Sequence, residues 1–210
     1  MLTLYDFSIA PSPRRARIFL TEKGIDFATV QIDLRSGGQF DDAYKAINPR
    51  STVPALKLES GQVLTENLAI ADYANNLKAD PPLIGVDAES RADVLQWNSR
   101  IEFEGLMAVA EMLRNSSKAM KDRALPGQLK LTQIPELAAR GQLRLADFFR
   151  RMNDHLEDRD FVSGENYSLA DITLLVCVDF SEWVKATPDA SLTHLHRWHS
   201  MASARPASKA

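Results

Sequence analysis

The sequence has little cysteine, no long apolar run and no excess of basic residues. Its single cysteine, Cys177, excludes an internal disulfide and a Cys-x-x-Cys redox pair. The formal net charge of -3 over 210 residues argues against a nucleic-acid-binding protein. No run of about 18 apolar residues is present, so we expect no membrane-spanning helix. The first residues lack a basic start followed by an apolar run, and we therefore expect no secretory signal and a cytoplasmic location.

The residues that are present predict two parts that divide near residue 80. Apolar residues make up 45% of the chain, which is ample for a buried core. In the first part, apolar runs predict strands at 2–6, 27–33, 55–58 and 63–64, and helical periods predict helices at 14–23 and 66–77. The order strand, helix, strand, hairpin, helix is typical of a thioredoxin-like α/β domain.

Helical periods dominate the second part and predict a helical bundle. The predicted helices cover residues 88–116, 135–156, 168–186 and 192–202. The pair Pro81-Pro82 interrupts the chain before them. We therefore expect an α/β domain at residues 1–79, a linker at 80–87 and an all-helical domain at 88–210, with residues 204–210 frayed at the end.

Three features of the helical part favour a structural interpretation. Ser168 and Asp171 have the Ser-x-x-Asp spacing of a capping box at a helix start. Cys177 lies in an apolar run, so we expect a buried packing thiol. Three histidines near the C-terminus have spacings of two and three residues, which suit no strong metal site. We therefore expect no bound metal.

Two stretches in the first part hold groups that recognise a ligand. Pro54 has no N–H and marks the start of a strand or a bend, and a cis Val53-Pro54 bond would leave the backbone of Val53 unpaired by the sheet. A backbone edge of that kind pairs with a peptide. Further on, Thr65 is expected to cap a helix whose free N–H groups suit a carboxylate, while Glu66 suits an ammonium. The two stretches predict a site for an α-amino acid head and a peptide backbone.

The chain resembles the cytosolic glutathione transferase family over nearly its whole length. The likeness rests on an ordered set of stretches: Leu2-Thr3-Leu4-Tyr5, the helix from Arg14 to Gly24, Ala46-Ile47-Asn48-Pro49-Arg50, the Val-Pro step, the Glu-Asn pair, and Ser168-Leu169-Ala170-Asp171-Ile172-Thr173. The resemblance implies a thioredoxin-like N-terminal domain, an all-helical C-terminal domain and glutathione as co-substrate, with no metal.

The resemblance also implies roles for particular residues. Val53 would hold the cysteinyl backbone of glutathione, Glu66 and Asn67 its γ-glutamyl end, and Gln39 its glycyl end. Serine is usual in the family at position 67, and the longer asparagine keeps one side-chain donor and one acceptor.

The helical part would supply two further surfaces. The family places its hydrophobic acceptor site against the first long helix, so Phe103 and Met107 are candidates for that site. The resemblance implies a homodimer, and the same helix carries apolar residues that suit a twofold contact, namely Leu95, Ile101 and Leu106.

The group that would activate the glutathione thiol is left open among three hydroxyls, those of Tyr5, Ser8 and Ser12. A donor at the end of the first strand, beside a helix N-terminus, lowers the pKa of a thiol by hydrogen-bonding its thiolate. Ser12 precedes Pro13, which suits the first helical position, so we expect Ser12 to cap the helix and to contact the sulfur. By the resemblance, Ala10 stands where several classes carry the active serine, and Ser12 where some bacterial classes carry cysteine.

We therefore expect a glutathione transferase that joins the glutathione thiolate to a hydrophobic electrophile. Two alternatives remain. Ala10 has no side-chain donor, which would permit a protein that binds glutathione without catalysis. The segment Gly37-Gly38-Gln39-Phe40 is similar to that of isomerase-type members, which favours a glutathione-dependent isomerase or dehalogenase.

Overall fold

The computed structural model describes residues 1–210, which form two compact units. The first unit comprises Met1–Pro81 with Pro126–Leu129 and Ala210, and the second comprises Pro82–Leu125 and Lys130–Lys209. The sequence predicted a linker at residues 80–87 between the two domains, and these boundaries stay a prediction.

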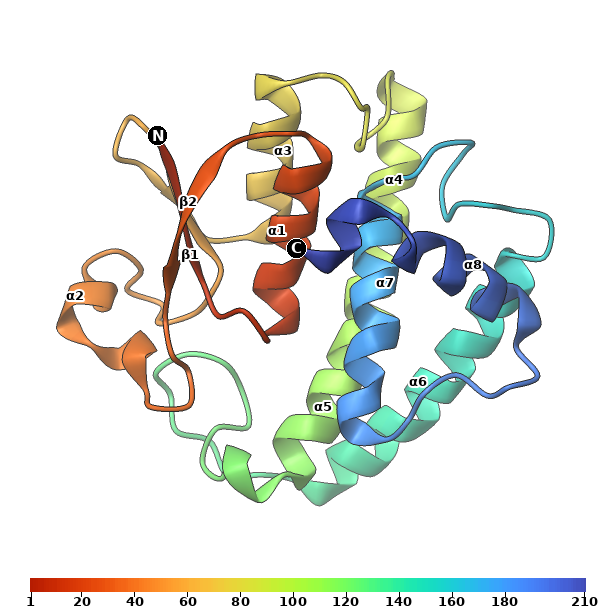
Figure 1. Ribbon diagram of the computed structural model, residues 1–210. Helices are drawn as coiled ribbons and strands as arrows, with labels where there is room; N and C mark the ends of the chain where they lie inside the picture. Colours follow the sequence, from red (N-terminus) through yellow and green to blue (C-terminus); the bar gives the residue numbers. More distant parts are fainter. The chain divides into compact units, whose positions relative to one another are not determined.

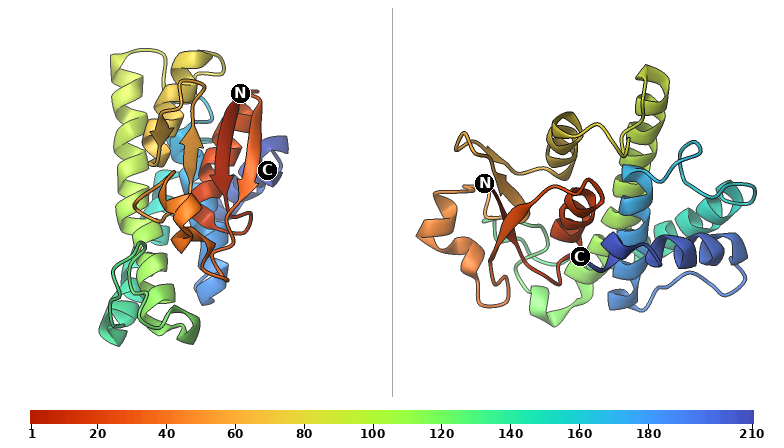
Figure 2. Two further views of the ribbon diagram at one scale, coloured as in Figure 1. Left: turned by 90° about the vertical axis from the view of Figure 1, so that its left-hand side faces the viewer. Right: turned by 45° about the horizontal axis from the view of Figure 1, so that its top comes forward.

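The first unit is a four-stranded sheet with two long helices. The strands are β1 (Leu2–Asp6), β2 (Phe27–Gln31), β3 (Ala55–Lys57) and β4 (Val63–Leu64), in the order β2-β1-β3-β4. Strands β1 and β2 are parallel, whereas β3 is antiparallel to both β1 and β4. Helices α1 (Pro11–Glu22) and α3 (Asn67–Leu77) pack side by side against the sheet (Figures 1 and 2). The predicted thioredoxin-like fold is confirmed.

The core of this unit follows the alternation of the strands and the apolar side of each helix. Every second residue of β1 is buried, beginning with Leu2 and Leu4, because successive strand side chains point to opposite faces. Ile18 of α1 and Ile70 of α3 are fully buried as well. No element was predicted between β2 and β3, where the structure has a 3₁₀ turn (Gly38–Phe40) and the short helix α2 (Asp42–Lys45).

A buried lysine closes the first unit at the end of α3. Lys23, the residue that ends α1, has no exposed surface. Its ammonium donates to Asn75 Oδ1 at 2.7 Å and to the carbonyl oxygens of Lys78 at 2.9 Å, Ala79 at 3.0 Å and Pro81. Burial lowers its pKa to about 8. The chain leaving α3 is thereby tied to the end of α1.

The second unit is all-helical, as predicted. Its helices are α4 (Ala88–Arg100), α5 (Met107–Ser116), α6 (Pro135–His155), α7 (Leu169–Ser181) and α8 (Thr193–Ser203). Helix α7 packs against α4, α5 and α8, and nearly all of its residues are buried (Figure 1). A π-helical segment, Ile101–Leu106, joins α4 to α5. The predicted helix over residues 88–116 is therefore present, but its regular spacing changes in the middle.

The start of α7 confirms the predicted capping box. Asp171 Oδ2 accepts from the backbone N–H of Ser168 at 3.0 Å and from its hydroxyl at 2.9 Å. Its other oxygen accepts from Val162 N–H at 2.9 Å and from Trp198 Nε1 at 2.9 Å. Asp171 is fully buried, and burial raises its pKa to about 6 against the opposing effect of these hydrogen bonds. The carboxylate therefore joins three segments as well as capping one helix.

Three smaller expectations have different outcomes. Cys177 is fully buried, as predicted. The predicted fraying of residues 204–210 is wrong, because Pro206–Lys209 form a 3₁₀ turn in which Ser208 is buried and donates to the carbonyl of Ser203 at 2.7 Å. None of the helices has both the length and the apolar character to cross a membrane.

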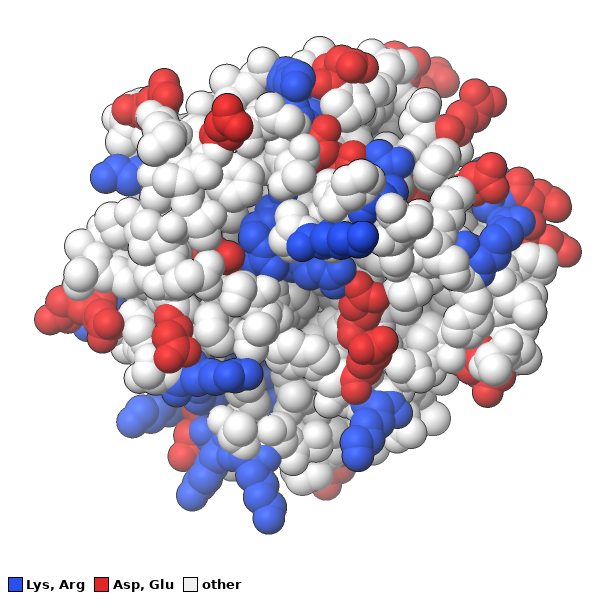
Figure 3. Space-filling view, in the orientation of Figure 1, with Lys and Arg blue, Asp and Glu red and all other residues white.

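On the face drawn in Figure 3, Lys and Arg side chains lie in separate groups with Asp and Glu between them.

Candidate functional site

Helix α1 begins earlier than predicted, which changes the position of Ser12. Ala10 is the N-cap and Pro11 the first helical residue, so Ser12 lies within the first turn and is not the cap. The reason is that Pro11 and Pro13 both suit a first turn, where an N–H is not needed, and the helix starts at the earlier one. Neither proline has an N–H, and Arg14 N–H donates to the carbonyl of Ala10 at 3.3 Å. Ser12 therefore supplies the backbone donor of this first turn that has no acceptor inside the helix.

The side chain of Ser12 contacts the start of α3. Asn67 Nδ2 donates to Ser12 Oγ at 2.9 Å, and Asn67 is 9% exposed. A hydroxyl that accepts this bond still has its own proton to donate. Asn67 Oδ1 is buried and has no hydrogen-bond partner within the protein. Buried polar atoms are rarely left unpaired, so we expect a water molecule or a ligand to donate to this oxygen.

Helix α3 begins one residue later than predicted. Thr65 is not the N-cap, because Glu66 has extended backbone angles, φ -111 and ψ 136, and Asn67 is the first helical residue. No side chain caps this helix, so its first N–H groups are available to a ligand. The side chain of Glu66 is exposed. A carboxylate and free N–H groups thus lie at one helix start, as predicted.

The Val53-Pro54 peptide bond is cis. Val53 lies before β3, whose pairing with β1 begins at Ala55, so the backbone of Val53 takes no part in the sheet. Two hydrogen bonds hold the preceding residue, Thr52, in place. Its carbonyl oxygen accepts from Tyr44 Oη at 2.6 Å and from Asn48 Nδ2 at 2.8 Å.

Tyr44 and Asn48 were not singled out by the sequence. The one signal for them was the Asn48-Pro49 step, which lies in the stretch from Ala46 to Arg50 that resembles the family.

Gln39 lies in the 3₁₀ turn Gly38–Phe40 and is 3% exposed. Its Oε1 is buried without a partner, as is the hydroxyl oxygen of Ser51. Together with Asn67 Oδ1, these are three buried side-chain oxygens of the first unit that have no hydrogen-bond partner within the protein. Such atoms mark places where a bound molecule or water completes the hydrogen bonding.

The other two candidate hydroxyls belong to the β1 side of the unit. Tyr5 is half-buried, with its ring 5.7 Å from that of Tyr44. Ser8 is exposed, and its carbonyl accepts from Arg17 Nη2 at 2.7 Å. Arg17 also pairs with buried Asp6 at 2.5 Å, so Arg17 stabilises the loop between β1 and α1.

The predicted acceptor residues lie in the second unit. Phe103 is 69% exposed within the π-helical segment, and Met107 is 43% exposed at the start of α5. Their spacing of four residues places the two apolar side chains near each other on one exposed side of the helix. Ile101 is fully buried, so it does not belong to an outward dimer face.

The C-terminal histidines have separate partners. His199 Nε2 lies 2.6 Å from Asp179 Oδ1, and His196 Nε2 lies 3.0 Å from the carbonyl oxygen of Asp189. No group of three or more His, Cys, Asp or Glu residues in the structure is arranged to hold a metal.

A four-stranded mixed sheet in the order β2-β1-β3-β4, with α1 and α3 packed against it, is a thioredoxin-like domain, and a helical unit follows it here. A family model described as "Glutathione S-transferase, N-terminal domain" matches residues 10–77, and one described as "Glutathione S-transferase, C-terminal domain" matches residues 107–206. The chain belongs to the glutathione transferase family, and the predicted family is confirmed.

Relatives and solved structures agree with this family. Glutathione S-transferase 2 of Saccharomyces cerevisiae is 28% identical over 210 residues, covering 99% of this chain and 88% of the relative. The crystal structure of Gtt2 from Saccharomyces cerevisiae has a TM-score of 0.90 at 27% identity, covering 99% of this chain and 98% of that one. A glutathione transferase homologue from Sulfitobacter, with bound glutathione, has a TM-score of 0.80 at 25% identity, covering 99% of this chain and 95% of that one.

Proposed function

We propose that this protein joins glutathione to a hydrophobic electrophile and that Ser12 holds the glutathione sulfur as a thiolate. The observation that carries the proposal is the hydrogen bond from Asn67 Nδ2 to Ser12 Oγ at 2.9 Å. The serine oxygen accepts this bond, and its hydroxyl proton can still be donated to the sulfur. The N–H of Ser12 is a second donor at the positive end of α1.

In the proposed reaction the thiol of glutathione loses its proton and the thiolate attacks an electrophilic carbon. A carbon–sulfur bond forms, and the leaving group departs with the bonding electron pair. A thiol of pKa about 8.5 is only about 3% ionised at pH 7, and lowering the pKa to about 6.5 raises that fraction to about three quarters. The less basic thiolate is about six- to tenfold less reactive, so the net gain is only about threefold. Ser12 therefore acts mainly by positioning the sulfur.

The remaining contacts of glutathione follow from the free groups of the first unit. The unpaired backbone of Val53 binds the cysteinyl residue, and Glu66 pairs with the α-ammonium. Asn67 Oδ1 accepts a hydrogen bond from the same γ-glutamyl end. The amide of Gln39 binds the glycyl end.

The acceptor, the assembly and the location complete the proposal. The acceptor lies against Phe103 and Met107, and detoxification is the physiological role. The protein acts as a cytoplasmic homodimer. Light scattering tests the assembly, since a monomer mass near 23.4 kDa at micromolar concentration would refute it.

Two other functions are separated from this one by a single set of measurements. Ala10 at the N-cap of α1 lacks a side-chain donor, which favours a protein that binds glutathione without catalysis. The Gly37-Gly38-Gln39-Phe40 segment favours an isomerase or dehalogenase. Turnover of a generic chromogenic electrophile distinguishes a transferase from a binder. Turnover of a cis-enone or an alkyl halide in which glutathione is regenerated rather than consumed distinguishes the second group.

The test of Ser12 uses the thiolate absorbance of bound glutathione against pH. We expect Ser12→Ala to raise the pKa of the bound thiol and to lower kcat more than the change in ionisation explains. Ser12→Thr keeps the hydroxyl and should keep most of the thiolate signal. If Ser12→Ala changes neither quantity while Tyr5→Phe or Ser8→Ala removes the thiolate signal, the proposed role of Ser12 is wrong.

A further inference from the structure

The π-helical segment frees one backbone carbonyl beside the candidate acceptor residues. Met107 N–H donates to the carbonyl of Glu102, five residues earlier. In a regular α-helix the same N–H would donate to Phe103, four residues earlier. The carbonyl of Phe103 therefore lacks its usual helical donor.

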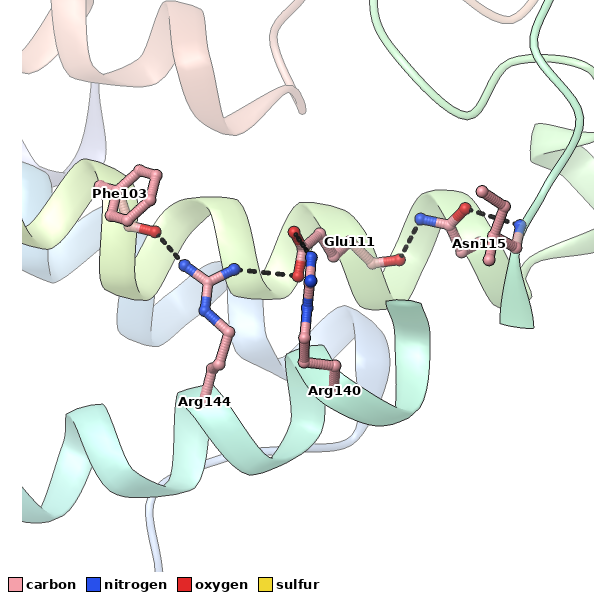
Figure 4. Close-up of polar contacts among 6 residues, drawn as sticks. Phe103, Glu111, Asn115, Arg140 and Arg144 are labelled. Atoms are coloured by element: carbon pink, nitrogen blue, oxygen red, sulfur yellow. Dashed lines mark hydrogen bonds and ion pairs between the residues drawn. The ribbon is translucent and has the colours of Figure 1, made fainter. Parts of the chain in front are cut away.

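Arg144 on α6 supplies that donor. Its Nη2 donates to the carbonyl of Phe103 at 2.6 Å, and its Nη1 donates to Glu111 Oε2 at 2.9 Å (Figure 4). The centre of the guanidinium lies 5.3 Å from the centroid of the Phe103 ring. The planar guanidinium thus contacts both the backbone and the ring of Phe103, while Glu111 fixes its orientation.

The opposite side of the π-helical segment is fixed by close packing. A Cβ atom on Gly105 would lie 2.6 Å from the ring of Phe148 and 2.7 Å from Cys177 Sγ. Glycine is therefore required for this segment to approach α6 and α7 so closely. The segment is held by packing at Gly105 and by hydrogen bonding at Phe103, and the ring of Phe103 stays exposed.

A second arginine provides an internal comparison. Arg140 Nη2 donates to the other oxygen of Glu111 at 3.0 Å, and its side chain is 58% exposed, against 26% for Arg144. Figure 4 shows both arginines reaching from α6 to Glu111, and only Arg144 continues to Phe103. The two residues thus share a partner and differ in the contact with Phe103.

We propose that Arg144 is a positioning residue that sets the specificity of the acceptor site, by holding the π-helical segment and the ring of Phe103. This inference rests on the proposed transferase function. Because the ring is 69% exposed and its orientation is fixed, it offers a flat apolar surface for offset stacking. The acceptor class that fits is a flat aromatic electrophile rather than a flexible aliphatic one.

The test compares Arg144→Met with the matched control Arg140→Met at saturating glutathione. Each variant is assayed with chlorodinitrobenzene as the aromatic acceptor and with hexyl iodide as the aliphatic one. We expect Arg144→Met to raise the KM for chlorodinitrobenzene about fivefold or more, with the KM for glutathione unchanged. The effect on hexyl iodide should be smaller, and Arg140→Met should change each KM by less than about twofold. Equal effects of the two substitutions would overturn the inference.

Phe103→Leu makes the test specific to the proposed contact. In the Phe103→Leu background, Arg144→Met should have little further effect on the KM for chlorodinitrobenzene, because the ring that it positions is absent. A full additional loss would overturn the inference. Arg144→Lys, which keeps the charge but cannot make the paired contacts, serves if Arg144→Met does not fold.

Amide hydrogen exchange separates this inference from the proposed function. Arg144→Met should speed exchange in residues 101–107, whereas Arg140→Met should not. If the wild-type protein turns over no electrophile, the transferase proposal fails and the exchange result still reports on positioning. Unchanged exchange together with unchanged KM values would overturn the role of Arg144 alone.

Discussion

The start of α7 differs from the starts of α1 and α3 in how the first backbone N–H groups of the helix are satisfied. Every helix begins with N–H groups that have no helical acceptor. At α7 the protein satisfies its own groups, because Ser168 and Asp171 form a capping box. At α1 and α3 no side chain caps the helix, and Asn67 keeps a buried oxygen without a partner. The start of α7 is thus closed by the protein's own side chains, whereas the proposed site uses the starts of α1 and α3, where a buried oxygen of Asn67 is still without a partner.

The largest effect is expected where α7 begins. Asp171→Ala would leave the buried donors of Val162, Ser168 and Trp198 without acceptors, so the free energy of unfolding should fall by about 3 kcal/mol or more. Urea unfolding measures the loss. The folded fraction should bind glutathione with little change, and a selective loss of glutathione affinity would contradict the structural role.

The matching substitution at α3 should have the opposite profile. Glu66→Ala removes an exposed carboxylate that caps nothing, so the melting temperature should stay unchanged. Affinity for glutathione should fall about ten- to a hundredfold, since a charge-assisted hydrogen bond contributes about 1.5–3 kcal/mol. Calorimetric titration provides the measurement, with Glu89→Ala in the second unit as the control for loss of an exposed acid. Unchanged affinity in Glu66→Ala would remove Glu66 from the site.

A substitution of similar shape tests the contact between the two open helix starts. Asn67→Asp replaces the amide donor by a carboxylate oxygen, which would accept the Ser12 proton instead of donating to Ser12 Oγ. We expect the pKa of bound glutathione to rise and kcat to fall about tenfold, with the fold intact. Asn67→Ser, the residue usual in the family, should keep most of the activity. A normal thiolate signal in Asn67→Asp would show that the hydroxyl proton is not directed by residue 67.

A further effect concerns pH and the carboxyl group of Asp171. Its pKa is raised to about 6 in the folded protein, above the value near 3.9 of an unfolded chain. Between these values the folded state binds more protons, so this group makes the free energy of unfolding fall as pH rises from about 4 to about 6. The change amounts to at most about 3 kcal/mol, and the slope should be absent in Asp171→Asn. Urea unfolding at several pH values tests this, and identical slopes for both proteins would show that folding does not raise the pKa of this carboxyl group.

Local patterns were sufficient to predict much of the fold. Strand β1 and the capping box of α7 were predicted because an apolar run and a Ser-x-x-Asp spacing are signals that lie within a few residues. The start of α1 was misplaced by a short distance, because Pro11 and Pro13 are equally suited to a first turn and only the folded structure selects between them.

The rest of the candidate site depends on contacts between residues far apart in the sequence. Asn67 and Ser12 are 55 residues apart, and Arg144 and Phe103 are 41 apart. Helical and strand periodicity in the sequence cannot predict contacts between residues so far apart. The π-helical segment was missed for a related reason, since its spacing depends on how closely Gly105 approaches its neighbours.

The buried ammonium of Lys23 anchors the chain that leaves the first unit to the end of α1. Ser12 lies in the first turn of α1, and Lys23 lies at the end of the same helix. Lys23 donates hydrogen bonds to carbonyl oxygens of the chain as far as Pro81. A helix of this length is a rod of about 18 Å. Helix α1 therefore carries the anchor of the chain that leaves the first unit at one end and the candidate site residue Ser12 at the other.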